Sequence, residues 1–442
     1  MQQYIDFFQE NRSKIDESCA PLVNEARGKA FEDFQQKGFP VYKSEDYQHT
    51  NIAELLSPDF GFYIGYAGPE VNPHKVFHCN VPNLSTHLHF VVNGQFYKEE
   101  ETTNELPKGV FSGSLNDFAQ NYSQLFSKYY NKLAETKGDG LSAFNTSFVQ
   151  DGYVLYVPKN IILENPLQIT NITNGKIDSL VNRRMLIIIE SGAQAKLLVC
   201  DHTTDEEPKF VATQVTEIFV EENGMLDFYE LEESTPNTIR LTANFVKQES
   251  SSNVMVNTLT LTNGITRNNY LIDLEGENAE TNLFGMAVAD EQEKIDNFTI
   301  INHRVPHCLS NELFKYVLEG KSVGAFSGRI IVFPDAQKTQ AYQNNRNLCG
   351  SNESRMYSKP QLEIYADDVK CSHGMTTGQL DENALFYMRS RGIPEEEARY
   401  LLKLAFTMDV LDGIRIEGIK DRLKTLVEKR FRGELVKCRG CI

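Results

Sequence analysis

Apolar residues follow the period of an α-helix at the start of the chain. Up to about residue 40 they recur at helical spacing among charged residues, which predicts helix. The apolar positions of this segment are Ile5, Phe8, Ile15, Ala26, Ala30 and Phe34. Gly38 and Pro40 then end the pattern. A second helical stretch is predicted at about 115–136, and short strand-like runs such as 88–92 precede it.

The pattern changes near Asp151 to a series of short β-type runs with turn residues between them. These runs are 153–157, 185–189, 196–199, 211–220, 226–231, 253–261, 270–274, 328–332 and 362–365. Several turns recur at intervals of roughly 25–30 residues, which is typical of the coils of a solenoid. No residue motif repeats with the turns, so the pattern favours a β-helix and leaves a β-sandwich or jelly roll as the alternative.

Helical signals return after Gly378. Asp381 is suited to cap a helix that Gly392 ends, and Pro394 precedes three glutamates that favour the start of a second helix. The second helix carries an apolar stripe of Ala398, Leu401, Leu402, Ala405, Phe406 and Val410. A third helical segment is predicted at 419–431. We therefore predict a helical and mixed domain at 1–150, a β-helix core at 151–368 and a C-terminal helical domain with a tail at 369–442.

Charge and composition exclude several classes of function. The net charge of −17 disfavours nucleic-acid binding, because a polyanion would be repelled by most of the surface. The sequence contains no run of about 18 apolar residues, so we expect no membrane-spanning helix. The first residues do not resemble a signal peptide. Eight scattered cysteines are then expected to be reduced thiols, so we predict a cytoplasmic protein.

Cys371 and His373 are the first candidates for chemistry. They lie two positions apart after a strand-like run, and in an extended chain such positions point to the same side. A thiolate and an imidazole are both good iron ligands, so the pair could share a metal ion. Two ligands do not complete a site. From the residues alone, a packed cysteine and a hydrogen-bonded histidine remain the alternative.

Other cysteines and histidines give weaker signals. Residues 438–441 form a CxxC pattern, but zinc would need two more ligands and a redox motif would need a βα context. His303 and His307 are four positions apart, with Cys308 next in the chain, so on a helix the two histidines could chelate a metal. Pro306 argues against a helix there. We therefore expect residues 438–441 to form an oxidation-prone tail. We expect His303, His307 and Cys308 to have a structural role.

No catalytic constellation is evident. Residues 320–322 read Gly-Lys-Ser like the end of a nucleotide-binding loop, but Lys315 stands where that loop needs its first glycine. No nucleophile and base stand at a recognisable spacing. We therefore expect no enzymatic activity. A β-helix enzyme that acts on polysaccharides is the alternative from another class, although the chain carries neither an export signal nor an evident acidic cluster.

Two long segments resemble the signature region of the SufB/SufD family. Residues 313–348 read LFKYVLEGKSVGAFSGRIIVFPDAQKTQAYQNNRNL, and residues 358–393 read SKPQLEIYADDVKCSHGMTTGQLDENALFYMRSRGI. The second is closer to the SufD type, which carries KCSHG as at 370–374. The stretch 38–52 also resembles the SufD pattern of Pro, Lys, Glu, aromatic and Thr, with Tyr47 in place of the usual Trp.

The resemblance implies a right-handed parallel β-helix flanked by helical domains, and a scaffold role in the SUF system of iron–sulfur cluster assembly. Similar proteins form a complex of one SufB, one SufD and two SufC ATPase subunits. SufB and SufD pair through their β-helices, and each C-terminal helical domain holds one SufC. A homodimer in isolation and a flavin in the complex are also compatible with the resemblance.

The resemblance also implies a role for the KCSHG segment. The histidine that matches His373 contributes to a transient cluster site opposite a SufB cysteine, with Cys371 as a secondary candidate. The alternative within the family is a SufB-like chain that carries the principal cluster cysteine itself. Cys349 and Cys371 are then the nearest candidates.

Overall fold

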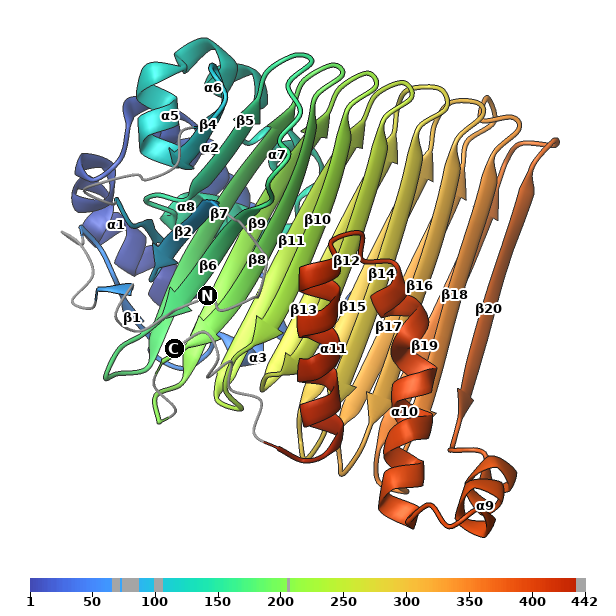
Figure 1. The fold of residues 1–442 in the computed structure, drawn as a ribbon. Helices are drawn as coiled ribbons and strands as arrows, with labels where there is room; N and C mark the ends of the chain where they lie inside the picture. Colours follow the sequence, from blue (N-terminus) through green and yellow to red (C-terminus); the bar gives the residue numbers. More distant parts are fainter. Residues whose placement is uncertain (66–71, 74–86, 99–105, 205–206, 435–442) are drawn as a thin grey trace.

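The chain forms a parallel β-solenoid of about seven turns with helices at both ends, as Figure 1 shows. The computed structural model describes residues 1–65, 72–73, 87–98, 106–204 and 207–434. The strands form two ten-stranded sheets; from β5 on, successive strands alternate between the sheets, and each pairs in parallel with the strand two places later. Met225 pairs with Asn253, and Gln340 with Lys370, so the coils have the predicted spacing. The predicted β-helix is confirmed, and the sandwich alternative is wrong.

The first sheet has the order β19-β17-β15-β13-β11-β9-β7-β5-β4, with β1 beside β7. Its strands are β1 (Gly61–Phe62), β4 (Phe111–Ser114), β5 (Tyr153–Val157), β7 (Ser179–Ile189), β9 (Phe210–Val220), β11 (Thr238–Gln248), β13 (Ile265–Leu274), β15 (Lys294–His303), β17 (Val323–Val332) and β19 (Arg355–Ile364).

The second sheet has the order β20-β18-β16-β14-β12-β10-β8-β6-β2-β3. Its strands are β2 (His87–Val92), β3 (Gln95–Phe96), β6 (Leu167–Thr173), β8 (Gln194–Thr203), β10 (Met225–Glu233), β12 (Asn253–Thr262), β14 (Glu280–Ala289), β16 (Leu309–Leu318), β18 (Gln340–Cys349) and β20 (Lys370–Gly378). The solenoid therefore takes in strands before residue 150 and runs on to Gly378.

Alternate side chains of both sheets meet inside the solenoid. Leu155, Ile187, Leu197, Phe228 and Phe314 belong to one buried apolar cluster that runs along the interior. Such burial is worth about 1.5–3 kcal/mol for a large apolar side chain, so this cluster is the main source of stability.

Charged residues also occupy inward positions. Arg183 donates to Asp201 at 2.8 Å, Arg240 binds the other oxygen of Asp201, and Arg240 reaches Glu230 at 2.9 Å. All four side chains are at least 95% buried. Burial opposes ionisation of Asp201, but the two arginines outweigh it and lower the pKa of this carboxyl. Each charge in the network thus depends on its partners.

Helices from both ends of the chain cover parts of the outer faces of the two sheets. The helices are α1 (Gln2–Glu17), α2 (Pro21–Lys37), α3 (Ile52–Leu55), α5 (Leu115–Asn121), α6 (Ser123–Tyr129), α7 (Lys132–Lys137), α8 (Gly140–Phe148), α9 (Glu382–Ser390), α10 (Glu395–Asp412) and α11 (Glu417–Phe431). The N-terminal helices α1, α2 and α5–α8 pack on β7, β9 and β11. The helices α10 and α11 pack on β8–β16 of the other sheet, as Figure 1 shows.

The helix ends follow local signals in the sequence. The side chain of Asp381 accepts hydrogen bonds from the backbone of Asn383 and Ala384, which confirms the predicted cap of α9. Pro21 occupies the first turn of α2, where a missing N–H costs nothing. The fully buried α8 was not predicted from the sequence. Among the described residues, no helix is long and apolar enough to cross a membrane.

Candidate functional site

The last coil of the solenoid has a free edge. Among the described residues, β19 and β20 stand at the ends of their sheets, so each pairs with a neighbouring strand on one side only. Apolar side chains remain exposed here, including Tyr357 at 46% and Met375 at 48%. A long open edge presents unpaired backbone N–H and C=O groups, which another strand can pair with. The two candidate ligands lie on this edge.

Cys371 and His373 are both on β20, on the side that faces the solenoid interior. Cys371 is half-buried against the interior cluster, and burial raises the pKa of its thiol. His373 lies two residues further along and is exposed. The structure therefore brings the two together on one side of one strand, as the spacing predicts. Among the described residues, no group of three His, Cys, Asp or Glu side chains could hold a metal ion, so any ligand set here is incomplete.

Two buried polar residues share the register position of His373. Gln343 on β18 pairs with His373, and Glu312 on β16 pairs with Gln343. Gln343 Nε2 donates to Glu312 Oε2 at 2.6 Å, and both side chains are completely buried. Burial raises the pKa of Glu312 to about 7, although the hydrogen bond from Gln343 opposes the shift. Sequence reasoning missed both residues, because nothing local distinguishes a polar residue that faces inward.

An N-terminal segment reaches the same end of the solenoid. Glu45 accepts a hydrogen bond from Lys359 on β19 at 3.0 Å, and the ring of His49 stacks on Tyr357 with centroids 4.2 Å apart. Residues of this segment, β19 and β20, together with residues of β13, β15 and β17, line a cavity of about 580 Å³. Met375 and Thr377 form its β20 wall. The segment 38–52, which resembles the SufD pattern, thus lies beside the candidate site.

Among the described residues, His303 and Cys308 are buried within the fold. His303 is buried in β15, where its Nε2 lies 2.8 Å from Ser310 Oγ, and burial lowers its pKa to about 3. His307 sits in the following turn, and the buried Cys308 donates to the carbonyl of Gly276. Burial also lowers the pKa of His89 to about 4. The cysteines of the CxxC pattern at 438–441 lie outside the described residues.

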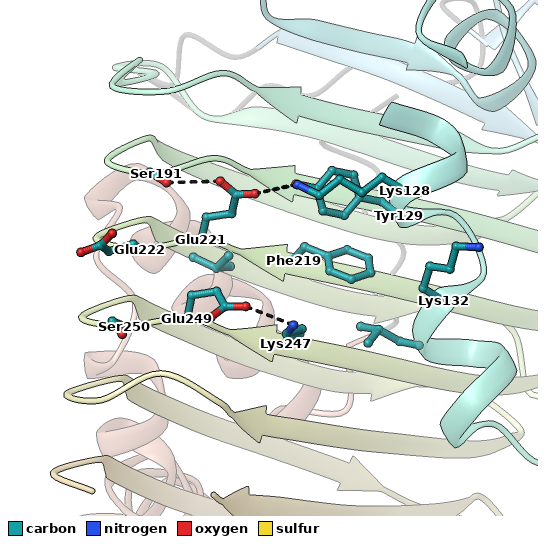
Figure 2. Close-up of a pocket in the computed structure, with 12 residues that line it drawn as sticks. Lys128, Tyr129, Lys132, Ser191, Phe219, Glu221, Glu222, Lys247, Glu249 and Ser250 are labelled. Atoms are coloured by element: carbon teal, nitrogen blue, oxygen red, sulfur yellow. Dashed lines mark hydrogen bonds and ion pairs between the residues drawn. The ribbon is translucent and has the colours of Figure 1, made fainter. Parts of the chain in front are cut away.

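A cavity of about 490 Å³ lies where α6 and α7 meet the turns of the first sheet, as Figure 2 shows. Burial opposes ionisation of Glu221, but hydrogen bonds from Tyr129, Lys128 and Ser191 together lower its pKa. Lys247 pairs with Glu249 at 3.1 Å. These contacts join the helices to the coils, and each named carboxylate already has a cationic partner.

Comparison with known families identifies the solenoid. Residues 171–406 match the family described as SUF system FeS cluster assembly, SufBD core domain, and residues 1–169 match the SufBD protein N-terminal region. The chain belongs to the SufBD family. The core match covers β7–β20, α9 and the part of α10 up to residue 406, so it includes the whole open edge. Membership in the SufBD family places the chain in iron–sulfur cluster assembly, and it gives no support to a polysaccharide enzyme.

Three relatives in the SufBD family match over three quarters or more of their own length. A SufBD family protein of Synechocystis sp. is 28% identical over 92% of this chain and 91% of its own. The iron–sulfur cluster assembly protein SufD of Escherichia coli is 27% identical over 90% of both chains. SufD of Bacillus subtilis is 25% identical over 74% of this chain and 75% of its own. These names agree with the resemblance of the KCSHG segment to the SufD type.

Proposed function

We propose that this chain is a non-catalytic, SufD-like scaffold subunit of a cytoplasmic SUF complex. The observation that carries the proposal is the open last coil, on which His373 is exposed without a complete ligand set. A residue of this kind is suited to a site that two subunits build together. The mechanism is presentation, because a rigid solenoid holds the imidazole where a partner supplies the remaining ligands.

The proposed partner at the open edge is a SufB-like subunit. β19 and β20 have ten and nine residues, and no strand of the described part of the chain covers their outer side, so strands of a second solenoid can extend both sheets. The outer faces of β18 and β20 lie beyond the coils that α10 and α11 cover. Without the partner, the same edge could pair with a second copy of this chain.

The proposed cargo is a transient iron–sulfur cluster at this interface. A neutral imidazole and a thiolate both ligate iron, and His373 is the accessible group of the two. Burial disfavours the thiolate of Cys371, so we assign this residue a secondary role. Flavin in the complex is not assigned to residues of this chain.

The proposed partner of the C-terminal helices is a SufC-like ATPase. On α10, Val410 and Leu411 face the sheet, whereas Leu401 and Leu402 are only half-buried and Ala405 is exposed. On the neighbouring α9, Phe386 is 72% and Tyr387 is 59% exposed, although both are large aromatic residues. Exposed aromatic residues on a projecting helix favour a protein contact over solvent.

The decisive experiment is cluster assembly by the complete complex with single variants of this chain. His373→Ala should lose cluster assembly while the complex still forms, because alanine can neither ligate iron nor move a proton. Cys371→Ser should be milder, with a stability loss of about 1 kcal/mol. His307→Asn is the matched control, since His307 is exposed in a turn with a positive φ that asparagine tolerates.

Two outcomes would contradict the proposal. Normal assembly by His373→Ala in an intact complex, or failure only because the complex falls apart, would make His373 a structural residue. A stable, stoichiometric cluster on the isolated reduced chain would favour the SufB-like alternative, in which Cys349 or Cys371 carries the cluster.

A further inference from the structure

Three inward-facing residues form a ladder that ends at His373. Glu312, Gln343 and His373 occupy one register position on β16, β18 and β20. Neighbouring strands lie about 4.8 Å apart, so side chains at one register position stack on each other. Gln343 is therefore the direct inward neighbour of the exposed histidine, and Glu312 lies one strand deeper in the solenoid.

Glu312 decides how the amide of Gln343 is oriented. Above its raised pKa of about 7, Glu312 is ionised and can only accept hydrogen bonds, so it binds the nitrogen of the amide. Gln343 Nε2 lies 2.6 Å from Glu312 Oε2. Gly328 on the opposite sheet leaves the space for this amide, because a Cβ atom there would collide with Gln343 Nε2. Gln343 Oε1 is buried and accepts no hydrogen bond from the described residues.

The amide oxygen of Asn345 is already engaged. Asn345 follows on the same inward side of β18, and its oxygen accepts from Ser358 and Asn347 at 2.7 Å each. Among the described residues, Asn347 Oδ1 on β18 also lacks a donor, but Asn347 pairs with Thr377, whereas Gln343 pairs with His373. An imidazole N–H can supply the donor that Gln343 Oε1 lacks.

We propose that Gln343, oriented by Glu312, is a positioning residue for His373: its amide oxygen accepts one ring N–H and leaves the other ring nitrogen as the ligand. A neutral imidazole carries one N–H and one lone pair, so fixing the first fixes where the second points. Histidines that bind metals generally donate their other N–H to a carbonyl or carboxylate in this way. This inference rests on the proposed function of His373.

The test is the tautomer ratio of His373 in the full-length chain, without any cluster. The chain is labelled with ¹⁵N-histidine, the ring signals of His373 are identified by their loss in His373→Ala, and spectra are taken at about pH 8.5, where an ordinary imidazole is neutral. Gln343→Met removes the amide and keeps the length of the side chain. Gln340→Met is the matched control, because Gln340 is an exposed residue of the same strand.

We expect one tautomer to predominate in the native chain. Gln343→Met should change the ratio about fivefold, toward that of a histidine in an unstructured peptide, because a net hydrogen bond is worth about 1 kcal/mol. Glu312→Gln should give an intermediate ratio, since an amide at 312 can also donate and no longer dictates the orientation of Gln343. This second variant keeps the test decisive if Gln343→Met does not fold.

An unchanged ratio in both variants, or a native ratio equal to that of the peptide, would overturn the inference. The cluster assembly assay distinguishes a failure of the positioning role of Gln343 from a failure of the proposed function of His373. If His373→Ala abolishes assembly while the ratio never moves, only the positioning role fails. If the ratio moves as expected while His373→Ala assembles clusters normally, the proposed function fails and the hydrogen bond remains as a structural contact.

Discussion

Replacing Glu312 by glutamine should make the protein relatively more stable at alkaline pH. Glu312 is completely buried, and burial raises its pKa from 4.5 to about 7. Below pH 4.5 the carboxyl is neutral in both the folded and the unfolded state. As the pH rises to 7, the unfolded chain releases the proton first, so the folded state loses stability. Above pH 7 both states are ionised and the loss is complete.

The magnitude follows from the size of the shift. The rise of the pKa from 4.5 to about 7 corresponds to a decrease of about 3 kcal/mol in the free energy of unfolding at alkaline pH. Globular proteins unfold with an entropy of about 2 cal/mol/K per residue, so a chain of 442 residues that unfolds as one unit should shift its melting temperature by about 3 °C. Glu312→Gln removes the titrating group and should avoid this loss.

The assay is thermal unfolding of both proteins at pH 5 and pH 8, followed by circular dichroism. The melting temperature of Glu312→Gln minus that of the native chain should rise by about 3 °C between the two pH values. Any constant cost of a buried amide cancels in this comparison. Glu353→Gln is the control, because the Glu353 side chain is 67% exposed. An equal difference at both pH values would refute the reasoning.

Two further variants probe other parts of the molecule. Asp201→Asn should lower the free energy of unfolding by about 3–5 kcal/mol in urea titrations, because Arg183 and Arg240 then stay buried with one carboxylate fewer. A decrease below about 1 kcal/mol would contradict this expectation. Replacing Phe386 and Tyr387 by alanine should leave the fold intact and weaken ATPase co-purification about tenfold or more, whereas the equally exposed Ile177→Ala should not. Undiminished binding by the double variant would exclude α9 as the contact.

Local patterns in the sequence indicated most of the long helices, several of the strands and the cap at Asp381, but not α8 or strands such as β14 and β16. They also determined that Cys371 and His373 share one side, because alternation along a strand depends only on the backbone of that strand. The spacing of the turns indicated a solenoid, and resemblance to a known family supplied the role of His373. These features need no knowledge of which strands pair.

The tertiary structure decided which polar residues face the interior. In β9 every residue is buried, since other coils cover one face and the N-terminal helices cover the other, so no alternation of polar and apolar residues marks the inward side. Asp201, Glu312 and Gln343 therefore look like ordinary polar residues of strands. Their partners lie on neighbouring coils, 18 to 39 residues away in the contacts described above.

The same reason applies to the surroundings of the candidate site. Glu45 and Lys359 are 314 positions apart, and no local pattern connects them. Only the stacking of coils carries β19 to the place that the N-terminal segment reaches. The sequence thus determined the two candidate ligands by their local spacing. The open edge, the ladder behind His373 and the N-terminal segment beside it depend on long-range pairing, which only the folded solenoid establishes.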